Sequence, residues 1–161
     1  MSGVEIVRRM SAQVPASEMF PHVADLEAYV AWMPLVHDVD TVVSSRSMGG
    51  TTAWSVELRA QVGPFARSKR LRMERTAVEQ DRLAVFERRE EDEREHSAWV
   101  LSAEIDEDPA RAGTTELTMT MRYDGSLWVG AVLERVLDDQ VRRGSERLAA
   151  LLEGDPQDLH G

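Results

Sequence analysis

The sequence predicts an α+β fold in which a curved, seven-stranded antiparallel sheet wraps around one long C-terminal helix, with two short helices after the first strand. Two patterns support this prediction. Between residues 39 and 125, hydrophobic and polar residues alternate with a period of two, which is typical of strands with one buried face. Between residues 127 and 152, the hydrophobic residues instead follow the helical period.

The N-terminal part predicts one strand and two short helices. The first strand carries hydrophobic residues at even positions, and Pro15 ends it. Ser17 can cap the first helix, whereas Asp25 can cap the second, which Pro34 stops. The predicted elements are a strand over residues 4–14 and helices over residues 17–23 and 26–33.

Six further strands are expected after the two helices. Turn sequences with Gly, Pro or Asp separate them, and such short connections make hairpins and therefore an antiparallel sheet. Nine consecutive charged residues, 87–95, predict a solvated hairpin tip. The six strands are expected at residues 39–43, 51–62, 68–76, 82–89, 97–105 and 114–125.

The C-terminal helix is expected over residues 127–152, and roughly 24 helical residues would span about 36 Å. It is the only predicted element large enough to cover the dry face of the sheet, so we expect the sheet to curl around it. A membrane-binding or partner-binding face is the alternative for its hydrophobic stripe. Core packing is favoured because acidic side chains would oppose an anionic membrane, namely Glu134, Asp138, Asp139, Glu146 and Glu153.

Length and composition predict one globular domain, residues 1–153, followed by a polar tail, residues 154–161, that we expect to be frayed. The 161 residues include no cysteine, which excludes disulfides and thiolate metal sites. The net charge of -10 makes nucleic acid an unfavourable partner. No signal peptide or membrane-spanning segment is apparent, so we expect a cytoplasmic protein without stable membrane insertion.

Three segments carry a resemblance to a known superfamily: VPASEMFPHVADLEAYVAWMPLV (residues 14–36), GPFARSKRLRM (63–73) and GAVLERVLDDQVRRGSERLAALLE (130–153). With the element order, they resemble START-like (SRPBCC) proteins, in particular the polyketide cyclase/dehydrase and lipid-transport branch. The resemblance spans nearly the whole chain. It implies a helix-grip fold with a cavity between the curved sheet and the C-terminal helix, where an apolar or aromatic molecule is held.

The residues of the dry face fit such a cavity, because broad aromatic and thioether groups suit irregular ligands. A filled core is the alternative, since aromatic and methionine residues at strand spacing are often plain packing. A ligand-binding cavity would have a volume of several hundred Å³, whereas a filled core would leave none of that size. The expected ligand-binding residues are Tyr29, Trp32, Trp54, Val56, Leu58, Met73, Trp99, Leu101, Met119, Met121, Tyr123, Val132 and Val136.

Arg75 is the candidate catalytic residue. Alternation places it on the face of Leu71 and Met73, unless a β-bulge between Met73 and Arg75 reverses the strand. Its position resembles that of the pocket arginine of aromatase/cyclases, which implies that it polarises a carbonyl or stabilises an enolate. An arginine that reaches solvent or an acidic partner is the alternative. Because a guanidinium is no general base at neutral pH, a cyclisation would need another group to remove a proton, and the sequence offers no obvious one.

Tyr29 and Trp32 lie where the superfamily closes the cavity mouth, so they are expected either to form a lid or to pack against the sheet edge. We expect no metal, because His22, His37 and His96 are too scattered for a ligand pair, and we expect no cofactor. Three functions remain open: a polyketide cyclase or aromatase, a carrier or sensor for a lipid, quinone or similar apolar metabolite, and a protein-interaction domain.

Overall fold

The computed structural model describes residues 4–42, 52–62, 64–92, 94–124 and 131–153. In chain order, its elements are β1 (Val4–Ala12), α1 (Ala16–Ala24), α2 (Leu26–Tyr29), β2 (Val36–Val42), β3 (Ala53–Val62), β4 (Phe65–Glu79), β5 (Leu83–Arg88), β6 (Ala98–Glu107), β7 (Thr115–Asp124) and α3 (Ala131–Glu153). The seven predicted strands and three predicted helices are therefore confirmed within these residues.

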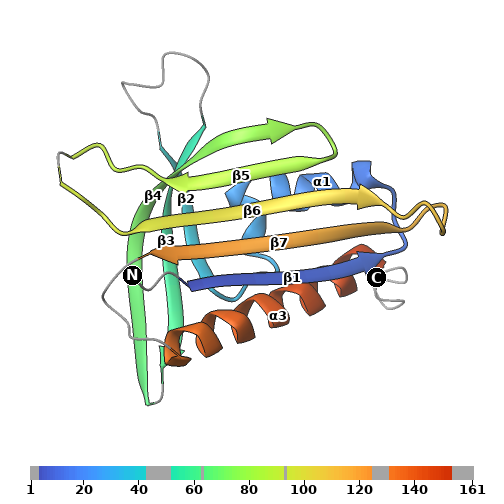
Figure 1. The fold of residues 1–161 in the computed structure, drawn as a ribbon. Coiled ribbons are helices and arrows are strands. Elements are labelled where there is room, and N and C mark those ends of the chain that lie inside the picture. The colour runs from blue at the N-terminus through green and yellow to red at the C-terminus, as the bar shows by residue number, and fades with distance from the viewer. Residues whose placement is uncertain (1–3, 43–51, 63, 93, 125–130, 154–161) are drawn as a thin grey trace, which may run out of the picture.

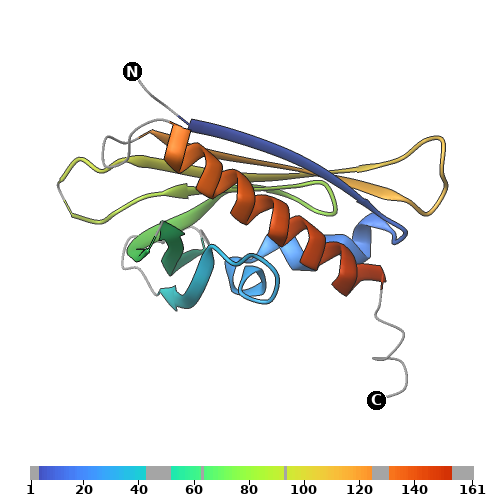
Figure 2. The same ribbon diagram turned by 90° about the horizontal axis from the view of Figure 1, so that it is seen from below.

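All seven strands form one antiparallel sheet with the order β1-β7-β6-β5-β4-β3-β2 (Figure 1). Neighbours in the sheet are also neighbours in the chain from β2 to β7, as hairpins require, and only β1 pairs across the chain, with β7. The sheet is strongly curved. The three helices lie on one side of it, and α3 crosses the concave face beneath β1 (Figure 2).

Strand alternation determines which side chains form the core. The alternation is clearest in β6 and β7, where every second residue over most of the strand is buried on the side of the helices and its neighbours are more exposed. On β6 the inner residues are Trp99, Leu101, Ala103 and Ile105, and on β7 they are Leu117, Met119, Met121 and Tyr123. The faces predicted from the alternating pattern are therefore the observed ones.

Helix α3 turns a narrower stripe to the core than the sequence suggested. Leu137, Val141 and Leu148 are fully buried, whereas Leu151, expected on the same stripe, is 47% exposed. Leu152, in the same last turn, packs against the core, so Leu151 lies on the side of the helix that faces away from it. None of the described helices is both long and apolar enough to cross a membrane.

The boundaries of the short helices differ from the predicted ones. Pro15, rather than Ser17, occupies the N-cap position of α1, and no side chain caps that helix. The second helix is four residues long instead of running to residue 33, because the chain tightens into turns after Tyr29. Pro34 follows these turns, and a residue before proline disfavours the helical conformation. The expected turns at residues 44–50 and at Gly63, the first residues of the predicted C-terminal helix and the tail lie outside the described residues.

Candidate ligand-binding site

An apolar cavity lies on the inner face of the sheet, beside α3. It is enclosed by side chains from strands β2, β3, β4, β6 and β7 and by two residues from α2 and the turn after it. Six of the predicted ligand-binding residues line it, and no described lining side chain is charged. The lining comprises Leu26, Met33, Val36, Val56, Leu58, Leu71, Met73, Trp99, Val100, Leu101 and Met121.

The cavity enclosed by these residues is small, with a volume of about 30 Å³. This space holds about one or two water molecules, whereas ligand pockets usually measure roughly 300–1,000 Å³. The expected cavity of several hundred Å³ is therefore wrong for the residues that enclose this one, because their side chains meet across it. Three of these side chains, Met33, Met73 and Met121, are unbranched thioethers that can repack around an entering molecule.

Three predicted ligand contacts belong instead to a solid aromatic cluster. Tyr29, Trp32 and Trp54 are at most 1% exposed, and Phe86 meets the rings of Tyr29 and Trp54 edge-on at 5.8 and 5.6 Å between centroids. Their polar atoms bond within the protein: Tyr29 Oη donates to the Val23 carbonyl at 2.9 Å and Trp32 Nε1 to the His22 carbonyl at 3.0 Å. The cluster packs α1 and α2 onto the sheet, which favours packing over a lid for Tyr29 and Trp32, and their role as ligand contacts stays a prediction.

Glu27 connects this cluster to the sheet edge. Its Oε1 atom accepts a hydrogen bond from Trp54 Nε1 at 3.1 Å and another from the hydroxyl of Thr41. One carboxylate of α2 is thereby bonded to both β2 and β3. No local pattern pointed to Glu27, because its partners lie 14 and 27 positions further along the chain.

Trp99 and Tyr123 form a second aromatic pair, at the end of the inner face where β6 begins and β7 ends. They are direct partners across the strands, and their ring centroids lie 4.5 Å apart. Trp99 lines the cavity, whereas Tyr123 packs against Trp99 outside the lining. Trp99 Nε1 and Tyr123 Oη are buried, and within the described part of the chain neither has a hydrogen-bond partner.

Met119 and Val136 are not among the described lining residues. Met119 is 1% exposed and lies two residues before Met121, the described lining residue of β7. Val136 is half-buried on α3, and the side chain of Val132 lies outside the described ones. Helix α3 reaches the cavity indirectly, because Gly144 packs against Met33, which lines it.

Arg75 faces inward as predicted, but its guanidinium lies at the junction of α1 and α2 instead of at the cavity. Nη1 donates to the Ala24 carbonyl at 2.7 Å and to Asp25 Oδ1 at 2.9 Å, and the guanidinium lies 5.8 Å from the centroid of the Trp54 ring. The β-bulge of β4 lies between Arg75 and Ala77. Because it follows Arg75, it does not change the side of the sheet on which Arg75 lies. The expected acidic partner is thus Asp25, and a catalytic role for Arg75 stays a prediction.

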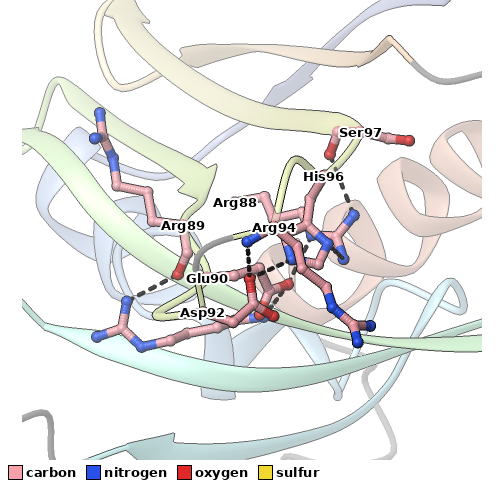
Figure 3. Close-up of polar contacts among 8 residues, drawn as sticks. Arg88, Arg89, Glu90, Asp92, Arg94, His96 and Ser97 are labelled. Atoms are coloured by element: carbon pink, nitrogen blue, oxygen red, sulfur yellow. Dashed lines mark hydrogen bonds and ion pairs between the residues drawn. The ribbon is translucent and has the colours of Figure 1, made fainter.

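The charged run 87–95 is exposed at Asp92, Arg94 and Glu95, as expected for a solvated hairpin tip, but its beginning is not. Arg88 lies on the inner side of β5, in step with Ala84 and Phe86, and its side chain is only 6% exposed. All three of its nitrogens have partners (Figure 3): Nε donates to Glu90 Oε2 at 2.7 Å, Nη1 to the Ser97 carbonyl at 3.2 Å, and Nη2 lies 3.2 Å from His96 Nδ1. These partners lie after the end of β5. The alternating pattern could therefore have predicted that Arg88 faces inward, but it could not have predicted which residues bind its guanidinium.

Two further contacts extend this cluster. His96 Nε2 lies 2.7 Å from Asp92 Oδ1, and the hydrogen bond from His96 lowers the pKa of the Asp92 carboxyl. On the neighbouring strand, Arg72 donates to the Arg89 carbonyl at 2.9 Å and pairs with Glu74. The cluster therefore fixes the β5–β6 connection to β4.

Lys69, the only lysine of the chain, lies on the same side of β4 as Leu71 and Met73, opposite Leu58. It is half-buried and, within the described part of the chain, makes no hydrogen bond or ion pair. Burial and the nearby Arg88 guanidinium lower the pKa of its ammonium group, whereas Glu90 acts in the opposite direction. A partly desolvated cation thus lies near the residues that line the cavity. Lys69 could have been predicted to face inward, because it alternates in step with Leu71 and Met73 along β4.

A second, wider hollow of about 410 Å³ opens at the other end of the sheet. It is lined by Pro15, Ala16, Ser17, Asp81, Arg82, Ile105, Asp106 and Glu107. None of the predicted site residues contributes to it. Most of its lining is polar or charged and open to solvent, so it lacks the apolar walls of a site for a hydrophobic molecule.

The concave sheet, the two short helices after β1 and the C-terminal helix in the concavity define a helix-grip domain of the START-like superfamily. Within that superfamily the chain belongs to the polyketide cyclase/dehydrase and lipid transport family, whose model matches residues 4–153. A comparison with curated protein sequences gave no match.

Several solved structures share the fold over nearly the full length. A START superfamily protein from Mycobacterium smegmatis is 12% identical, with a TM-score of 0.69 and coverage of 92% of this chain and 97% of the other. An aromatase/cyclase from a Streptomyces species is 13% identical, with a TM-score of 0.67 and 94% of both chains covered. A protein from Deinococcus radiodurans is 16% identical, with a TM-score of 0.64 and coverage of 93% and 98%. At such identities the likeness concerns the fold.

Proposed function

We propose that this domain binds a small hydrophobic or aromatic molecule, such as a polyketide, lipid or quinone, in the apolar cavity beside α3. The observation that carries the proposal is the cavity itself, whose eleven described lining residues are all apolar or aromatic. Membership of a family described by polyketide cyclisation and lipid transport supports the same class of ligand. Because the observed cavity is small, binding requires the lining side chains, the methionines above all, to move outward.

Binding without chemistry is the form of this function that the described residues favour. A cyclase needs a group that removes a proton, and none of the described lining side chains can do so at neutral pH. The guanidinium of Arg75 is already occupied by Ala24 and Asp25. The similarity in fold to an aromatase/cyclase keeps cyclisation as the second candidate, with Arg75 as its proposed polarising residue.

Binding of the solvatochromic dye prodan tests the proposal. We expect saturable, near one-to-one binding with a blue-shifted emission, and displacement by palmitate or a polycyclic quinone. Leu101→Phe fills the cavity and should weaken the affinity by about fivefold or more. Leu117→Phe enlarges an equally buried residue outside the lining, so it should cost stability without a comparable loss of affinity. Equal affinities in both variants would place the dye elsewhere.

A further inference from the structure

The buried aromatic residues divide into two groups by the state of their polar atoms. Tyr29, Trp32 and Trp54 each donate to a carbonyl or carboxylate oxygen at 2.9 to 3.1 Å. Trp99 Nε1 and Tyr123 Oη are also shielded from solvent, but they have no hydrogen-bond partner among the described residues. Buried donors are normally satisfied, because an unpaired one has lost its hydrogen bonds to water without replacement. The two exceptions therefore need an explanation.

Their position supplies one. Trp99 is a lining residue of the apolar cavity, and Tyr123 is its direct partner on the adjacent strand, with the two rings in contact. The three aromatic side chains with satisfied polar atoms lie outside the lining. The unpaired donors of these aromatic residues thus lie on one lining residue of the cavity and on the ring packed against it, whereas Tyr29, Trp32 and Trp54 keep their donors paired.

We propose that Trp99 Nε1–H and the Tyr123 hydroxyl form a donor site for the polar end of the ligand, which is therefore an apolar molecule carrying a carbonyl or carboxylate oxygen. This inference rests on the proposed function, since it assigns the chemistry of one end of the same site. The apolar walls hold the hydrocarbon part, and the two donors select molecules with an acceptor oxygen at the position that reaches them. Hydrogen bonds in such a dry site contribute strongly to selectivity, because a ligand without the oxygen leaves both donors unpaired.

Two naphthalenes of similar shape test the donor site. 2-Acetylnaphthalene carries a carbonyl group, whereas 2-isopropylnaphthalene replaces it with hydrocarbon. Measured by displacement of prodan, the wild-type protein should prefer the acetyl compound beyond the difference in their hydrophobicity. Tyr123→Phe should reduce that preference by roughly two- to tenfold, the usual range for one hydrogen bond. Trp99→Phe should reduce it as well, by removing the other donor.

Tyr29→Phe is the matched control, because it also deletes a buried hydroxyl, but one that is bonded to the Val23 carbonyl. It should lower the melting temperature and leave the preference unchanged. Tyr123→Phe should leave the melting temperature of the ligand-free protein unchanged or raise it, since an unpaired hydroxyl is removed. A loss of stability as large as that of Tyr29→Phe would show that a bound water already satisfies Tyr123, and would overturn the proposal.

The remaining outcomes separate the two proposals. If the wild-type protein binds both naphthalenes saturably but without the expected preference, or if the preference survives both substitutions, the donor site is wrong and the apolar binding site stands. If neither naphthalene nor prodan binds saturably, the proposed function itself fails.

Discussion

Arg75 is an inward-facing cation whose hydrogen bonds hold two short helices against the sheet. Its guanidinium bonds the Ala24 carbonyl and the Asp25 carboxylate, which are the last residue of α1 and the residue between the two short helices. A carbonyl at a helix C-terminus lacks a partner within the helix, so the arginine satisfies it. It thereby holds α1 and α2 against β4.

We expect Arg75→Met to lower the stability by roughly 1–3 kcal/mol, the usual cost of losing hydrogen bonds to a charged group. The affinity for prodan should stay within about twofold of wild type. Thermal unfolding and dye titration measure the two quantities, and Arg59→Met, which removes an exposed arginine of β3, is the control. Unchanged stability with weakened ligand binding or lost turnover would instead support the catalytic role predicted from the sequence.

Lys69 gives a pH-dependent prediction with one clear reporter. Burial and Arg88 lower the pKa of its ammonium group in the folded protein, so the folded state binds this proton less tightly than the unfolded chain does. The resulting cost to stability is fully present below the folded pKa. It disappears as the pH rises from the folded pKa to the ordinary lysine value.

As the chain has a single lysine, ¹³C-labelled lysine should give one side-chain NMR signal whose midpoint lies below the ordinary value of about 10.4. Glu90→Gln should lower the midpoint further, because Glu90 is the neighbour that raises it. A midpoint at or above the ordinary value, or an upward shift in Glu90→Gln, would contradict this description of the site.

At the scale of elements, α3 is fixed to the rest of the domain by close packing at Gly144 and by a charged contact with β1. A Cβ atom at position 144 would lie 2.9 Å from Met33 Sδ and 3.3 Å from Met33 Cα. Two turns earlier in the helix, Asp138 accepts a bond from Arg8 Nε at 2.8 Å. The helix can therefore approach the turn after α2 only where it has no side chain.

Gly144→Leu should destabilise the domain by roughly 1–3 kcal/mol, as overpacking usually does, despite the better helix propensity of leucine. It should also weaken prodan binding, because it displaces Met33, which lines the cavity. Ala150→Leu makes a similar change at an exposed position of the same helix and should alter neither property. Wild-type stability and affinity in Gly144→Leu would show that α3 does not approach Met33 as described.

The elements also show what the sequence could predict. Strand faces followed from alternation, since a period of two leaves only two choices and the apolar choice is buried. Helix ends did not follow, because Pro15 replaced Ser17 at the N-cap and the carboxylate of Asp25 bonds Arg75 instead of capping α2. The burial of Arg88 was not predicted, because this arginine lies within a run of charged residues. Its partners Glu90 and Ser97 are determined by the path of the chain between β5 and β6.

For the whole molecule, the fold and the site differ in how far the sequence determines them. Seven strands joined mainly by hairpins and one long amphipathic helix allow few other arrangements. The cavity depends instead on the sheet curvature and on side-chain volumes that are not local properties. Val56, Leu58, Met73, Trp99, Leu101 and Met121 were therefore predicted to face inward correctly, whereas the size of the gap between them was not.

The central claim is that an apolar molecule enters the cavity beside α3, and methyl NMR of the methionines tests it most directly. With ¹³C-methyl methionine and saturating prodan, we predict intermolecular contacts to Met33, Met73 and Met121, which line the cavity, and none to Met10 or Met19, which do not. The lining methyl signals should shift in proportion to the bound fraction and saturate near one equivalent. Saturable binding with contacts confined to Met10 or Met19, or no change in the three lining methyls, would contradict the claim.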